Sequence, residues 1–188
     1  MYFNDLSHHW LYKRKKSIIN LILSIIIKEV ESINFLLLLS YVLLGGYMKI
    51  NYKRLISFIL IPVLLGALVG LITSVNSDID SIIPKWIFPV VWTILYILMG
   101  ISSYIVYEKV GKIPDIYVIQ LIFNLLWSFV FFKFRWFTIA FIWIIVLFIL
   151  VLRMIKEFKM IDKRAGNLQI PYALWLIVAA VLNLMKII

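Results

Sequence analysis

The feature that most constrains this fold is an apolar run, Trp86–Tyr107, of 22 residues without a charge. At about 1.5 Å rise per residue, a helix of this length crosses a hydrocarbon layer of about 30 Å. Five of its residues recur at three- or four-residue intervals and so share one helical face: Trp92, Tyr96, Gly100, Ser103 and Tyr107. A helix that only contacted lipid would not need such a face. The run therefore predicts a transmembrane helix that packs against others.

Further apolar segments predict an all-α integral membrane protein. With 64% hydrophobic residues and a mean hydropathy of +1.05, a chain of 188 residues has more apolar surface than a soluble domain can bury. The segments are too long for strands and lack the alternation of a β-barrel. The fourth segment, almost uniformly Ile, Leu, Phe and Val, is expected to be the most exposed to lipid. We predict a five-helix bundle with spans at about Leu55–Ile72, Trp86–Tyr107, Ile116–Phe132, Phe137–Leu152 and Leu168–Met185.

The chain divides into an N-terminal extension, residues 1–47, and a five-helix domain, residues 48–188. One interpretation of the extension is a signal peptide or anchor with Lys13–Lys16 as its basic flank, although no convincing cleavage site follows. A second is an additional span interrupted by the charged segment Lys28–Glu31. A third is that the natural protein starts at Met48, so that the codons of the preceding glycines form a ribosome-binding site. Mass spectrometry of the natural N-terminus distinguishes these interpretations.

The basic residues predict an orientation in the membrane. Ten lysines and arginines lie near Met48 or in the loops 108–115 and 153–166, and four lie on the opposite side. By the positive-inside rule, the Met48 end and both loops are cytoplasmic, in a bacterial cytoplasmic membrane. The net charge of +10 therefore reflects orientation, and we expect the lipid bilayer rather than nucleic acid as partner.

The composition excludes several kinds of chemistry. The chain has no cysteine, and its only histidines are His8 and His9, so the predicted spans hold no ligand for haem iron and no metal site is expected. None of the span interiors carries a charged residue, which an ion-coupled pump normally needs. No nucleophile–base pair or phosphate-binding loop occurs, so hydrolase and kinase functions lack support.

Aromatic and small polar residues form one face on each of the second, third and fifth predicted helices. Turned inward, these faces would line a cavity for a large, flat, mostly apolar ligand. The candidate residues are Trp92, Tyr96, Asn124, Trp127, Tyr172 and Trp175. A structural role is the alternative, because amides often link transmembrane helices and tryptophans often lie at the membrane interface. Spacing alone leaves both interpretations open.

Three segments resemble the TspO/MBR family, also called tryptophan-rich sensory proteins, translocator proteins or peripheral-type benzodiazepine receptors. WIFPVVWTILYILMGISSYIVY (86–107) is similar to the family's second helix, LIFNLLWSFVFF (121–132) to its third and IPYALWLIVAAVLN (170–183) to its fifth. The resemblance covers Met48 to Ile188. It implies a five-helix membrane bundle, often a homodimer, that binds porphyrins such as protoporphyrin IX and requires no cofactor.

The resemblance also implies roles for individual residues. Trp92 and Trp175 match the two pocket tryptophans tied to porphyrin chemistry, and Asn124 and Ala179 match pocket-lining positions. With Tyr96, Trp127 and Tyr172, they are the expected ligand-binding residues. Three functions follow as hypotheses. They are porphyrin transport or sensing without turnover, light-dependent porphyrin degradation with Trp92 and Trp175 as candidate catalytic residues, and a purely structural role in membrane assembly.

Two segments depart from the family pattern. The first loop, SVNSDIDSIIPKWIF, is shorter and lacks the Trp-Tyr and paired prolines that close over the pocket in relatives. The C-terminal segment, VLNLMKII, has no tyrosine, so the family's cholesterol motif is absent.

Overall fold

The computed structural model describes residues 50–74 and 86–187, together with positions 13, 14, 17, 21 and 24. The predicted extension, residues 1–47, lies almost entirely outside the described residues, as does most of the shortened first loop. In the described part, five helical segments are long and apolar enough to cross a membrane. The prediction of an all-α membrane bundle is therefore confirmed.

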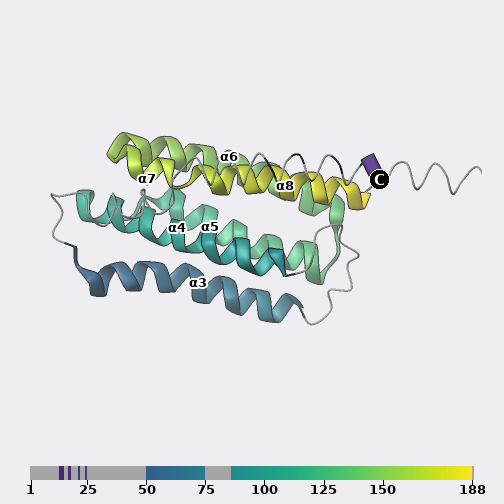
Figure 1. Cartoon of the computed structure of the whole chain (residues 1–188), viewed down its shortest axis with the longest axis horizontal. Helices are drawn as coiled ribbons and strands as arrows, with labels where there is room; N and C mark the ends of the chain where they lie inside the picture. Colours follow the sequence, from purple (N-terminus) through teal and green to yellow (C-terminus); the bar gives the residue numbers. More distant parts are fainter. Residues whose placement is uncertain are drawn as a thin grey trace, which may run out of the picture.

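The helices follow the predicted order along the chain, with two short additions. The elements are α3 (Tyr52–Ser74), α4 (Ile87–Val110), α5 (Asp115–Ser128), the π-helical turn η1 (Phe129–Lys133), α6 (Phe137–Ile161), α7 (Lys163–Asn167) and α8 (Ile170–Ile187). Figure 1 shows the long helices side by side, with α6 and α8 above α4 and α5, and α3 below.

Local signals explain where several helices begin and end. Asn51 caps α3, because its Oδ1 accepts a hydrogen bond of 3.1 Å from the Arg54 backbone N–H. Gly111 ends α4 in the left-handed conformation, with φ +72°, and its N–H donates to the Tyr107 carbonyl. Pro114 is extended and directly precedes α5. The predicted loop 108–115 is thus present but shorter, because only residues 111–114 lie between α4 and α5.

The predicted loop 153–166 is wrong, because α6 continues to Ile161 and α7 follows immediately. The segment RMIKEFKMI is amphipathic: Met154, Ile155 and Phe158 are buried, whereas Arg153 and Lys156 are exposed. The buried Phe158 stacks on Tyr117 of α5, with ring centroids 6.1 Å apart. The charges that suggested a loop therefore lie on the outer face of a helix that is anchored to the bundle.

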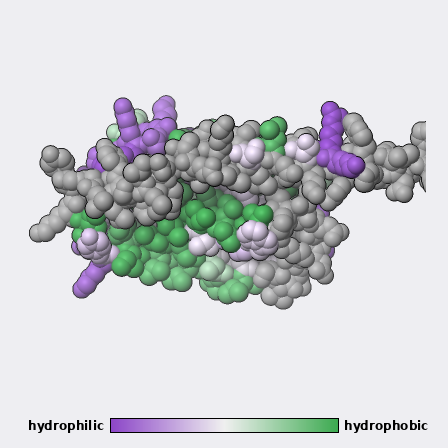
Figure 2. All heavy atoms as spheres, in the orientation of Figure 1, coloured by the Kyte–Doolittle hydropathy of each residue, from purple (hydrophilic) through white to green (hydrophobic). Residues whose placement is uncertain are grey.

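The helix α3, rather than α6, is the least buried of the five. Only 17% of its most apolar 18-residue stretch is buried inside the bundle, against 33% of the corresponding stretch of α6. Leucines and isoleucines form its exposed face, and Figure 2 shows hydrophobic side chains over this side of the molecule. The expectation that the fourth span is the most exposed is therefore wrong, because a uniformly apolar helix can still pack on two neighbours.

Two glycines allow α3 and α4 to approach closely. A Cβ atom at Gly100 of α4 would lie 2.5 Å from the Ile59 Cα and 2.6 Å from the Phe58 carbonyl oxygen. Gly66 of α3 faces the Tyr96 ring, which occupies the space that a Cβ would need. By contrast, a Cβ at Gly70 would meet nothing within 4 Å. Small residues at Gly66 and Gly100 therefore set the α3–α4 spacing.

Ion pairs connect the helices at the end where α4 stops and α7 begins. Asp162, between α6 and α7, accepts from Lys109 Nζ at 2.8 Å and from Arg164 Nη2 at 3.1 Å. Although its burial opposes ionisation, the hydrogen bonds from Arg164 and Lys109 hold the pKa of the Asp162 carboxyl well below its usual range. At the same end, Arg54 of α3 pairs with Glu108 of α4 at 2.6 Å.

We expect Asp162→Asn to lower the free energy of unfolding by about 1–2 kcal/mol at pH 7, because both cationic partners are partly exposed and can be resolvated. A lowered folded-state pKa contributes stability above the unfolded value of about 3.9, and this contribution is lost as the pH falls toward the folded value. The difference between wild type and variant should therefore shrink below about pH 4. Thermal unfolding in detergent between pH 3 and pH 7 measures it, and a constant difference would contradict this origin.

Candidate functional site: a buried aromatic cluster

A chain of hydrogen bonds links α4, α5 and α8 in the interior. The Tyr96 hydroxyl donates to Asn124 Oδ1 at 2.7 Å, and Asn124 Nδ2 donates to the Tyr172 hydroxyl at 2.9 Å. Asn124 and Tyr172 are each 1% exposed. The Asn124 amide of α5 thus joins α4 to α8, so that the three helices with the predicted polar faces are linked through one side chain.

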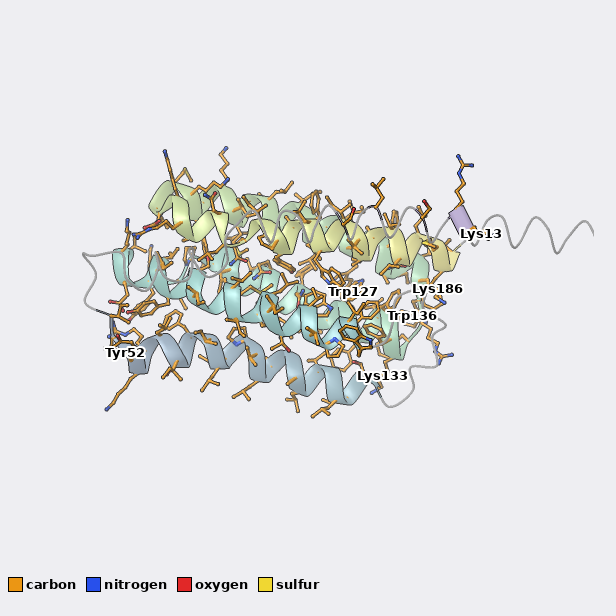
Figure 3. The ribbon with its side chains drawn as sticks, in the orientation of Figure 1. Lys13, Tyr52, Trp127, Lys133, Trp136 and Lys186 are labelled. Carbon is orange, nitrogen blue, oxygen red and sulfur yellow. The ribbon has the colours of Figure 1, made fainter. Side chains whose placement is uncertain are left out.

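Aromatic rings surround this chain. Trp92 contacts three of them, with centroid distances of 5.6 Å to Tyr96, 6.2 Å to Tyr172 and 6.5 Å to Trp127. Trp127 also donates its indole N–H to the Ala140 carbonyl of α6 at 3.2 Å, which fixes the ring against that helix. Figure 3 shows Trp127 inside the bundle, whereas Trp136 lies at its end. Four of the predicted residues therefore form one continuous cluster with Asn124.

The remaining two predicted residues lie at the edges of this cluster. Trp175 is 1% exposed and contacts Phe88 of α4 edge to face, with centroids 6.1 Å apart. Ala179 packs in a second apolar group with Trp127 and Phe131, and Trp92 packs against both groups. All seven predicted residues thus belong to one connected region.

The turn between α5 and α6 shapes the outer end of the cluster. The π-helical residues Phe129–Lys133 widen the last turn of the third span, so that Phe131 stacks on Trp127 at 5.0 Å and also contacts Phe137 of α6. Arg135 then adopts a positive φ of 55° to reverse the chain. The predicted third and fourth spans leave a short connection at residues 133–136, and the structure has one at residues 134–136, but the sequence does not reveal the π-helical geometry of Phe129–Lys133.

The cluster is uncharged and largely filled by its own side chains. Tyr96, Trp127, Tyr172 and Trp175 are each at most 6% exposed, and Trp92 is the partly exposed member. Within residues 50–74 and 86–187, no group of three His, Cys, Asp or Glu residues lies close enough to hold a metal ion. The site therefore offers ring stacking, hydroxyl and amide hydrogen bonds, and tryptophan redox chemistry.

Two residues next to the cluster were missing from the predicted set of ligand-binding residues. Phe88 lies one turn before Trp92, and this spacing is the signal that could have found it. Gln120 lies one turn before Asn124 on the same predicted face and is completely buried.

The geometry defines a multi-pass helical membrane protein with an uncharged, tryptophan-rich interior. The sequence model of the TspO/MBR family matches residues 58–187, which include all five spans except the start of α3. The chain belongs to the TspO/MBR family.

Curated relatives agree with this assignment. The chain is 36% identical over 102 residues to the tryptophan-rich sensory protein of Cereibacter sphaeroides, an alignment that covers 53% of this chain and 65% of that protein. It is 34% identical over 106 residues to the tryptophan-rich protein TspO of Chlorobaculum tepidum, which covers 53% of this chain and 67% of that protein. Similarity extends to the translocator protein of Ovis aries, at 29% identity over 107 residues, 53% of this chain and 63% of the relative. The alignments thus span about two thirds of each relative.

Proposed function

We propose that this protein binds a tetrapyrrole, with protoporphyrin IX as the best-fitting ligand, between α4, α5 and α8. The observation that carries the proposal is the hydrogen-bonded chain Tyr96–Asn124–Tyr172 beside the indole rings of Trp92 and Trp127. A porphyrin is a flat π-system with polar edges, and it needs aromatic faces for stacking and neutral polar groups for orientation. A metal-free porphyrin fits best, because these helices carry no histidine to ligate iron.

Ligand access is proposed at the Trp92 end of the cluster. Trp92 is its partly exposed member, and near it α4 and α8 meet through the ring contacts Trp92–Tyr172 and Phe88–Trp175. Rings in contact can separate at a lower cost than hydrogen-bonded helices, because no polar group loses a partner. A ligand that inserts there replaces ring–ring contacts with ring–porphyrin contacts.

Titration of the purified protein in lipid nanodiscs with protoporphyrin IX tests the proposal. We expect saturable quenching of tryptophan fluorescence, because Trp92, Trp127 and Trp175 would lie at the ligand. Trp127→Phe should weaken binding by about tenfold, through loss of stacking area and of the indole hydrogen bond. Trp136→Phe is the matched control, because Trp136 is exposed at the end of the bundle and should leave the affinity unchanged. Linear, non-saturable quenching would contradict a binding site.

Light-dependent porphyrin degradation is the second candidate function, favoured by the contact between Trp92 and Trp127. In this reaction an indole gives one electron to the excited porphyrin, and dioxygen serves as the final oxidant. Illumination of the aerobic complex tests it, with Trp92→Phe and Trp175→Phe for comparison. If porphyrin absorbance decays no faster than in protein-free nanodiscs, transport or sensing without turnover is the remaining function. A structural assembly role predicts no saturable binding at all.

We also propose the orientation and assembly expected from the sequence. Figure 3 places Tyr52 at one end of the bundle, and Lys133, Trp136 and Lys186 at the other. The Tyr52 end also holds the basic residues of the 108–115 connection and of the helical segment 153–166. The positive-inside rule therefore assigns this end to the cytoplasm of a bacterial cell. We propose a homodimer because of the family resemblance. The exposed apolar helix α3 offers surface for lipid or for a second copy.

A further inference from the structure

Gln120 is a fully buried amide in the middle of a transmembrane helix. Its side chain is 0% exposed, and neither Nε2 nor Oε1 has a hydrogen-bond partner among the residues that the structure describes. An amide can make four hydrogen bonds, and each unpartnered buried atom costs about 1–3 kcal/mol. Such a group persists in a stable fold where something outside the protein chain satisfies it.

Two other buried amides make at least one hydrogen bond within the bundle. Asn124, one turn further along α5, has its oxygen bound by Tyr96 and its nitrogen bound to Tyr172. Gln169, just before α8, donates from Nε2 to the Leu98 carbonyl at 3.3 Å, although its Oε1 has no partner within the described part. Gln120 is therefore the only one of these three amides with neither atom bonded.

The position of Gln120 connects it to the proposed ligand site. Residues four apart on a helix lie about 6 Å apart on one face, so Gln120 continues the line from Trp127 and Asn124 along α5. The line runs from the Trp92 end, where access is proposed, toward the end at which α5 begins. A flat ligand that stacks on the tryptophans and separates the hydrogen bonds of Asn124 to Tyr96 and Tyr172 would reach the level of Gln120 with its far edge.

We propose that Gln120 binds the carboxyl group of the ligand at the inner end of the site. The inference rests on the proposed tetrapyrrole function and adds the group that the site recognises. A primary amide presents a donor and an acceptor side by side, and a carboxylic acid presents the complementary pair. In the bound pair, Nε2 donates to the carboxyl C=O and the carboxyl O–H donates to Oε1. The neutral form of the acid suits the uncharged surroundings, since an unpaired carboxylate there would be costly.

Protoporphyrin IX and its dimethyl ester differ only in the carboxyl groups, so together they test the proposal. The full chain in nanodiscs is titrated with each ligand, as wild type, as Gln120→Leu and as Gln120→Met. We expect wild type to bind the acid about tenfold more tightly than the ester, the size expected for one or two net hydrogen bonds. Both variants should bind acid and ester equally, with the loss confined to the acid. A variant that keeps the wild-type preference overturns the proposal.

Unfolding without ligand gives a second readout that does not depend on porphyrin. We expect both variants to unfold at the same or a higher temperature than wild type, because an unpartnered amide is replaced by an apolar group of similar size. A lower unfolding temperature would show that the free protein already satisfies Gln120, and it would overturn the proposal. Gln169→Leu is the control. It should unfold earlier, because it loses the bond to Leu98, while it keeps the preference for the acid.

Failure of the two proposals gives different results. If wild type binds neither porphyrin saturably, the proposed function fails and the carboxyl site fails with it. If wild type binds both, and Gln120→Leu discriminates as wild type does, only the role of Gln120 is wrong.

Discussion

Gly100→Leu is expected to lower the free energy of unfolding by about 3 kcal/mol or more, the upper range for overpacking in a close-packed interior. Even the first added carbon would meet backbone atoms of Ile59 and Phe58, and backbone cannot move aside as a flexible side chain can. The helices α3 and α4 would have to separate along their shared contact. Chemical or thermal unfolding of the purified protein, followed by circular dichroism, measures the loss.

Gly70→Ala is the matched control, because it lies in α3 and has open space around its Cβ position. Alanine favours a helix over glycine by about 1 kcal/mol, so this variant should be as stable as wild type or slightly more stable. If Gly100→Ala is tolerated as well as Gly70→Ala, the close approach of α3 and α4 does not determine stability.

Asn124→Leu should destabilise the protein by about 2–4 kcal/mol and strongly weaken porphyrin binding. The substitution leaves the buried hydroxyls of Tyr96 and Tyr172 without their partner, and each loss costs about 1–3 kcal/mol. It also removes the polar group that would orient a ligand on the rings. The free energy of unfolding and the porphyrin dissociation constant are both measured on the same preparation.

A triple variant separates the two effects of Asn124. When Tyr96→Phe and Tyr172→Phe accompany Asn124→Leu, all three polar groups of the hydrogen-bonded chain are removed together and none of them is left unpaired. Much of the lost stability should therefore return. Porphyrin affinity should not return, because the orienting amide is still missing. If the triple variant is less stable than Asn124→Leu alone, the hydrogen bonds do not account for the single variant's loss.

The sequence predicts the spans because lipid imposes length and polarity directly. It also predicts Trp92, Tyr96, Asn124 and Trp127 on inward faces, because helical spacing and a family resemblance agree there. It fails at the end of α6, where an amphipathic continuation carries as many charges as a loop would. A high density of charged residues indicates contact with solvent. A loop and an amphipathic helix both provide that contact. Only the burial of Met154 and Phe158 against neighbouring helices distinguishes them.

Other features depend on contacts between distant segments. The partners of Asn124 come from residues 28 and 48 positions away in the chain, so spacing cannot reveal that both sides of its amide are occupied. The same limit hides the difference between Asn124 and Gln120, which look equivalent on a helical face. The outer end of the cluster depends on the π-helical turn, for which the segment FVFFK gives no recognised signal.

The contacts between α4 and the chain from α7 to α8 differ from one end to the other. At one end the segments are joined by polar bonds: Ser102 Oγ donates to the Ala165 carbonyl at 2.7 Å, Gln169 Nε2 donates to the Leu98 carbonyl, and Lys109 pairs with Asp162. At the other end, near Phe88, rings touch without a hydrogen bond between them. The segments are bonded directly at one end and meet only through ring contacts at the other. Insertion of the proposed ligand would therefore separate them at the Trp92 end, and the movement would be limited by the hydrogen bond between Gln169 and Leu98.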